Sequence, residues 1–157
     1  MKYVTIRLSH AHQTWLYLVF ALIFVSGAGW LIFHYWVPTQ GEFGEAHHPS
    51  EPWWMRLHGA ASFLFLFLFG TVVPNHVKRA WQMRRNRISG VSFCSANVLL
   101  TLTGYALYYF SGEDSRTAIG ALHWIIGLVF PVLVGWHVWA GRRSRHLRHI
   151  PAEPIHS

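Results

Sequence analysis

Four long apolar stretches, separated by short polar segments, dominate the pattern of side chains along the chain. They contain no Asp, Glu, Lys or Arg and cover residues 8–41, 57–77, 88–112 and 117–141. Each reaches the roughly 20 residues that a helix needs to cross a bilayer. We therefore predict an all-α fold, an integral membrane four-helix bundle with helices near 13–36, 55–77, 91–111 and 118–140. A cleaved signal peptide is the alternative for the first stretch, but that stretch is too long and no small-x-small cleavage site follows it.

Basic residues are concentrated on one side of the predicted membrane. The residues of that side are Lys2, Arg7, Lys78, Arg79, Arg84, Arg85, Arg87, Arg142, Arg143, Arg145 and Arg148. The opposite loops hold only Arg56 and Arg116. By the positive-inside rule the basic side faces the cytoplasm, so both termini are predicted to be cytoplasmic. The net charge of +7 therefore reflects membrane topology, with the lipid bilayer as partner and no nucleic acid.

The segments between the predicted helices are too short to form further domains. The outer loop at 37–54 is rich in Pro and Gly, and we expect it to serve as a cap or a docking surface. A basic tail occupies 142–157. We therefore predict a single transmembrane domain over 1–157.

Composition agrees with a membrane protein. The chain is 52% hydrophobic and only 12% charged, which leaves too few charges to solvate a soluble domain of this size. Its single cysteine, Cys94, excludes an intrachain disulfide and the Cys-x-x-Cys-His motif that attaches haem covalently.

Four histidines lie within two of the apolar stretches: His58 and His76 in the second, His123 and His137 in the fourth. An ionisable side chain at membrane depth costs a few kcal/mol, so its presence there indicates a functional site. The 18 residues from His58 to His76 close nearly five helical turns, and both rings point the same way. The 14 residues from His123 to His137 return to within about 40° and rise about 21 Å, most of a bilayer core of about 30 Å. Each helix can thus present one imidazole near each membrane face.

Imidazole is an axial ligand of b-type haem, so the two pairs predict two haems stacked across the membrane. His58 and His123 are the predicted ligands of the outer haem, and His76 and His137 those of the inner haem. The rise from His58 to His76 is about 27 Å on a regular helix, about 6 Å more than in the other pair. A distortion at Pro74 would absorb this difference. Otherwise His76 is not a ligand.

Two histidines of the first stretch compete for these roles. His12 is an alternative to His76 on the inner haem. Measured from the basic side of the membrane, it lies about as deep in the first helix as His137 lies in the fourth. His34 is an alternative to His58, or serves proton transfer or bonds a haem substituent. The histidines outside the predicted hydrocarbon region are expected to be solvated: His10, His47, His48, His146, His149 and His156.

The chain resembles the bacterial cytochrome b561-like membrane subunits, which include the b-type cytochrome subunits of membrane hydrogenases and formate dehydrogenases. The matching segments are Ser26-Gly27, Leu57-His58-Gly59, Leu102-Thr103-Gly104-Tyr105, and Leu122-His123 with His137 fourteen residues further on. The resemblance implies that the fourth helix gives one ligand to each of two haems, and that a second-helix histidine, His58, completes the outer site. Family members often take the remaining ligand from the first helix, which favours His12, and His76 is a departure from that pattern.

The resemblance also implies a multi-pass protein of the bacterial inner membrane, with a quinone bound near the inner haem. Polar residues available for the quinone are Asn86, Ser89 and Asn97. Iron held by two imidazoles has no open position for a substrate, so such sites suit electron transfer. We therefore predict a respiratory electron-transfer subunit that connects a redox protein subunit on the outer face to the quinone. We predict no catalytic residues in this chain. As a subunit of an oxidoreductase complex, the one reaction in which it could take part is quinone oxidoreduction.

Two functions of other classes use the same features. One is a haem-free metal-ion or proton transporter based on the histidines, although the four apolar stretches offer it no Asp or Glu. The other is a passive membrane anchor for a redox enzyme.

Overall fold

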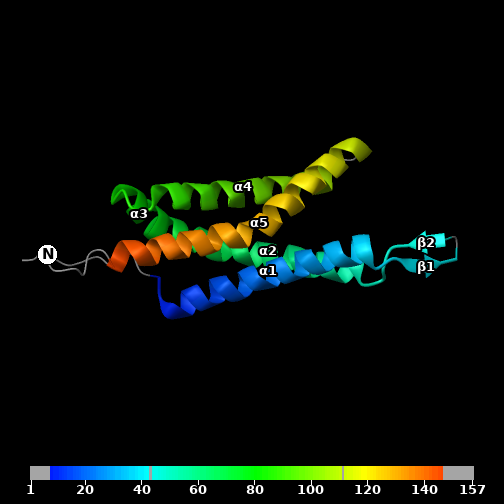
Figure 1. Ribbon diagram of the computed structural model, residues 1–157, viewed down its shortest axis with the longest axis horizontal. Coiled ribbons are helices and arrows are strands. Elements are labelled where there is room, and N and C mark those ends of the chain that lie inside the picture. Colours follow the sequence, from blue (N-terminus) through cyan, green and yellow to red (C-terminus); the bar gives the residue numbers. More distant parts are fainter. Residues whose placement is uncertain (1–7, 43, 111, 147–157) are drawn as a thin grey trace, which may run out of the picture. The chain divides into compact units, whose positions relative to one another are not determined.

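The computed structural model describes residues 8–42, 44–110 and 112–146 (Figure 1). Most of the basic tail, with His149 and His156, lies outside these residues. The chain divides into two compact units, residues 1–79 and 80–157.

The first unit is a helical hairpin. Its elements are α1 (His10–Trp36), β1 (Thr39–Gly41), β2 (Gly44–Ala46), α2 (Glu51–Val72) and a π-helical segment, η1 (Val73–Val77). Ser9 caps α1, because its side chain accepts a hydrogen bond from the His12 amide at 3.2 Å. The helix ends at Trp36 because Val37, which precedes Pro38, leaves the helical region at φ −128°.

The predicted outer loop contains a short antiparallel β-hairpin, β1–β2, that the sequence did not reveal. Thr39 pairs with Ala46, and Gly44 takes a φ of +115° that favours glycine at the turn. The Thr39 hydroxyl donates to the Ala46 carbonyl at 3.0 Å. The loop ends at residue 50, because Glu51 and Pro52 already form the first turn of α2.

Helices α1 and α2 pack side by side in antiparallel fashion, as Figure 1 shows. Contacts near the start of α1 reach the end of α2, as between His12 and Thr71, and contacts further along α1 reach the start of α2, as between Gly29 and Trp54. The buried side chains along this seam are Val19, Ser26, Leu31, Ala61, Phe65 and Val72.

The distortion expected at Pro74 is present. Proline has no N–H to give and its ring crowds the preceding turn, which disrupts the regular hydrogen-bond ladder. The chain widens here into η1, where the Lys78 amide donates to the Val73 carbonyl five residues back. The short helix α3 (Lys78–Gln82) follows. His76 lies within η1, so the regular-helix rise calculated from His58 does not apply to it.

The second unit is another antiparallel pair, α4 (Arg87–Tyr109) and α5 (Glu113–His146). The turn before α4 uses left-handed backbone at Arg84 and Asn86, with φ of 52° and 46°. Glu113 and Asp114 in the first turn of α5 complement the positive end of its dipole. The buried residues of this pair are Ser89, Ala96, Asn97, Thr103 and Phe130.

Helices α1, α2, α4 and α5 are each long and apolar enough to cross a membrane. Large apolar side chains are exposed along them, including Phe63 and Val132, which are 80% and 69% exposed. Such apolar exposure suits contact with lipid rather than water. The all-α fold with four membrane-length helices is thus confirmed, and two helical hairpins are the components that the predicted bundle requires.

Candidate functional site

His58 is held by the backbone of α1. Its Nδ1 lies 3.0 Å from the Ile23 carbonyl oxygen and 3.3 Å from Ser26 Oγ. A carbonyl can only accept, so Nδ1 carries the hydrogen and donates it. The neutral ring then has its lone pair on Nε2.

Ser26 and Gly27 shape the place where the His58 ring rests. The Ser26 hydroxyl is fully buried and donates its single hydrogen to the Leu22 carbonyl at 2.7 Å, so its oxygen accepts from His58. A Cβ at residue 27 would stand only 3.0 Å from His58 Cε1. The ring therefore approaches α1 this closely because residue 27 is glycine.

His123 repeats this arrangement between α5 and α4. The Thr103 hydroxyl donates to the Leu99 carbonyl at 2.7 Å, and its oxygen lies 2.9 Å from His123 Nδ1. Because the hydroxyl has given its hydrogen away, the histidine donates. The next residue, Gly104, has room for the ring: a Cβ there would be 3.3 Å from His123 Cε1.

His137 is held in the same way, about four turns further along α5. Ser89 Oγ lies 3.2 Å from His137 Nδ1 and donates to the Asn86 carbonyl at 3.2 Å. Gly90 follows Ser89 and faces His137 Cε1. Phe93 stacks on the imidazole with the ring centroids 5.7 Å apart.

Three of the four predicted ligands therefore share one local structure. Each imidazole rests on a Ser/Thr-Gly dipeptide of its neighbouring helix, with Nδ1 within 3.3 Å of the hydroxyl oxygen. Two of these dipeptides, Ser26-Gly27 and Thr103-Gly104, were noted in the sequence for their resemblance, but Ser89-Gly90 was missed. The signal was available, because the three Ser/Thr-Gly dipeptides that lie within described helices are the three that hold a histidine.

The two candidates for the fourth ligand differ in setting. His12 uses the other nitrogen: its Nε2 lies 3.2 Å from Thr71 Oγ1, which itself donates to the Leu68 carbonyl at 2.7 Å. His12 Nε2 is therefore a donor in this structure. His76 is partly buried within η1, and π-helical segments are frequent at functional sites. The choice between them stays a prediction that favours His76.

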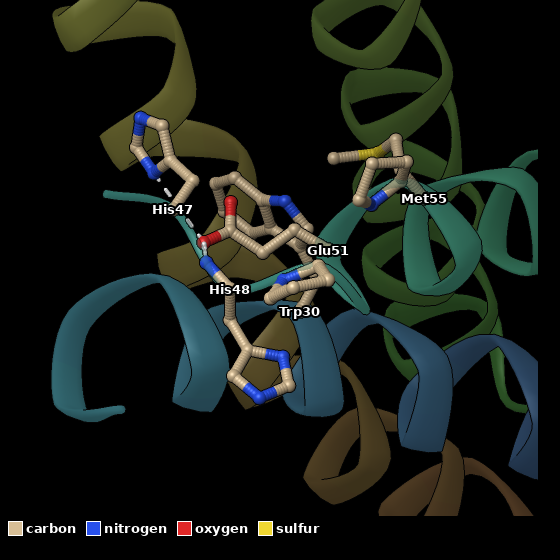
Figure 2. Close-up of a pocket in the computed structure, with 7 residues that line it drawn as sticks. Trp30, His47, His48, Glu51 and Met55 are labelled. Carbon is tan, nitrogen blue, oxygen red and sulfur yellow. Dashed lines mark hydrogen bonds and ion pairs between the residues drawn. The ribbon is translucent and has the colours of Figure 1, made fainter. Parts of the chain in front are cut away.

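His34 belongs to a different group of side chains. Its Nδ1 lies 3.0 Å from Glu51 Oε2, and Trp30 stacks on its ring at 4.5 Å. His47, expected to be solvated, is exposed but also contacts the Glu51 carboxylate. Figure 2 shows the His47 ring and the His48 backbone converging on that carboxylate.

A pocket opens at the start of α4, beside the dipeptide that holds His137. It has a volume of about 380 Å³, and its lining residues are Arg84, Asn86, Arg87, Ile88, Ser89, Trp136 and Ala140. Two of the three polar residues predicted for a quinone, Asn86 and Ser89, lie in this lining. Asn97 does not, because it is buried further along α4.

No family model, curated protein or solved structure matches this chain.

Proposed function

We propose that this chain is a membrane-embedded b-type dihaem cytochrome. It relays electrons across the bilayer between a redox protein on the outer face and a quinone on the inner face. The observation that carries the proposal is the common setting of His58, His123 and His137, each of which has its Nδ1–H committed to an acceptor on the neighbouring helix.

This setting suits haem ligation. A metal-ligating histidine normally donates its second ring N–H to a fixed acceptor, which sets the tautomer and the ring orientation and makes the ligating nitrogen more basic. The Ile23 carbonyl with the Ser26 hydroxyl provides that acceptor for His58, and the Thr103 and Ser89 hydroxyls provide it for His123 and His137. Each hydroxyl is itself bonded to a backbone carbonyl. In the proposal His58 and His123 hold the outer haem, and His137 holds the inner haem with His76. Haem iron between two imidazoles exchanges single electrons and offers no position for a substrate.

The pocket at the start of α4 supports the quinone part of the proposal. Arg84, Arg87 and Asn86 offer hydrogen-bond donors, which a quinone's carbonyl oxygens require. Trp136 offers an aromatic face for the quinone ring. Ser89 links the pocket to His137 through its hydrogen bond, so a bound ring would lie close to the inner ligand.

The experiment that tests the proposal is haem quantification in single-histidine variants. The full chain is purified in detergent, and haem per chain is measured as the pyridine complex. We expect two haems in the natural chain and one in each of His123→Ala and His137→Ala. His48→Ala is the control, because this ring packs against Phe33 and belongs to neither predicted ligand pair, and it should keep two haems. Equal haem content in all four proteins would refute the ligand assignment.

A further inference from the structure

Three metal-binding side chains meet where α1 ends and α2 begins. His34 comes from the last turns of α1, His47 directly follows β2, and Glu51 is the first residue of α2. One donor atom from each lies within 4.8 Å of the other two. None of the three belongs to the predicted haem-ligand pairs, although His34 was an alternative for one.

The distances between these donors are close to those in a metal centre. Glu51 Oε2 lies 3.0 Å from His34 Nδ1, and Oε1 lies 3.3 Å from His47 Nδ1. The two imidazoles stack nearly parallel, with centroids 5.0 Å apart. A tetrahedral ion with bonds of about 2.0–2.2 Å needs donors about 3.3–3.6 Å apart. The two imidazole planes are nearly parallel, so one ring must turn for both to face one ion, and the exposed His47 ring has the room to do so.

The surroundings hold two of the donors in place and leave the third open to solvent. The Glu51 side chain is only 10% exposed, and its Oε1 accepts a hydrogen bond from the His48 amide at 3.2 Å. Trp30 stacks on His34 with an interplanar angle of 17°. The His47 side chain is 76% exposed, and the adjoining pocket, lined by Trp30, His48 and Met55 among others, gives an ion access (Figure 2).

We propose that His34, His47 and Glu51 form a binding site for a divalent transition-metal ion of the Zn²⁺ type. Imidazole donors favour zinc and copper over magnesium and calcium, which prefer all-oxygen sites. Two histidines and one glutamate form a donor set used by zinc sites that keep a fourth position open for water. A bound ion would tie the β1–β2 hairpin to both helices of the first unit. This site is independent of the proposed haems.

Zinc titration of the purified full-length chain tests the site. The chain carries other histidines, so the affinity tag is removed, and Zn²⁺ binding is measured by calorimetry in competition with a chelator of known affinity. We expect one tight site per chain. Glu51→Gln removes the charge but keeps an oxygen for the His48 amide, and His47→Ala alters an exposed side chain that the fold does not need. Each should weaken the tight site at least tenfold.

His48→Ala is the matched control, because the His48 ring bonds Ser50 rather than the donor group. It should bind zinc as the natural chain does. The proposal is overturned if the natural chain shows no saturable site, if Glu51→Gln and His47→Ala bind zinc unchanged, or if His48→Ala weakens binding as much as they do. Haem content measured in the same samples keeps this result separate from the outcome for the proposed cytochrome function.

Discussion

Replacement of Thr103 by Val removes the acceptor for His123 while changing little else. The valine methyl occupies the place of the hydroxyl, and His123 Nδ1–H then loses its acceptor at 2.9 Å. Thr103 is only 9% exposed, so water has poor access to the orphaned N–H. The substitution thus removes one hydrogen bond of one proposed ligand, together with the hydroxyl's own bond to the Leu99 carbonyl.

The size of the effect follows from the cost of an unsatisfied buried donor. Such a donor destabilises its structure by about 1–3 kcal/mol, which agrees with the 10- to 100-fold loss of metal affinity typical when a partner of a metal-ligating histidine is removed. The lost bond also makes the ligating nitrogen less basic, which disfavours ferric iron. If about 1 kcal/mol acts on the ferric state alone, the outer midpoint potential rises by about 40 mV.

The assay is a redox titration of the purified chain, with haem loss to a scavenging apo-globin measured in parallel. Thr101→Val is the control: its hydroxyl donates to the Asn97 carbonyl at 2.9 Å, but residue 101 lies about 200° around α4 from Thr103. We expect Thr103→Val to raise one of two potentials and speed the loss of one haem, and Thr101→Val to do neither. Identical behaviour of the two variants would refute the reasoning about Nδ1.

Two further predictions concern the other ligands. Gly27→Ala places a Cβ 3.0 Å from His58 Cε1, so we expect the ring to leave Ile23 and the outer haem to be lost, while the inner haem, counted in the same spectrum, remains. His76→Ala should remove the inner haem and His12→Ala should keep it, because the proposal pairs His137 with His76 in the π-helical segment η1; spectra showing the reverse would make His12 the ligand.

The number and approximate position of the membrane helices could be predicted from the sequence, because bilayer thickness sets the length of a charge-free run. The helix ends could not. Helix α2 begins at Glu51 rather than near 55, and α5 runs from Glu113 to His146 rather than over 118–140. A charge-free run measures the part of a helix that fits in hydrocarbon, whereas a helix continues into water wherever acidic residues favour its N-terminus and basic residues its C-terminus.

The spacing of the histidines predicted which rings share a helix face, but not what holds them. Helical periodicity is a local property, so it relates His123 to His137. The contact of His123 with Thr103, or of His137 with Ser89, depends on how two helices pack. Ser-Gly and Thr-Gly dipeptides inside the apolar stretches indicate such contacts, although two of them were noted only for the family resemblance and Ser89-Gly90 was not noted.

The group around Glu51 lay beyond sequence reasoning for a similar reason. His34 and His47 meet the Glu51 carboxylate only because the β1–β2 hairpin reverses the chain between α1 and α2. The sequence showed Pro and Gly in this segment, which indicates turns but not their geometry.

An absorption spectrum of the purified chain, recorded oxidised and then reduced, tests the central claim most directly. We expect the sharp reduced bands of low-spin b-type haem at about two haems per chain, because paired imidazoles fill both axial positions. A chain that folds in detergent and shows no haem bands would contradict it, and would leave the histidines to transport or to structural contacts.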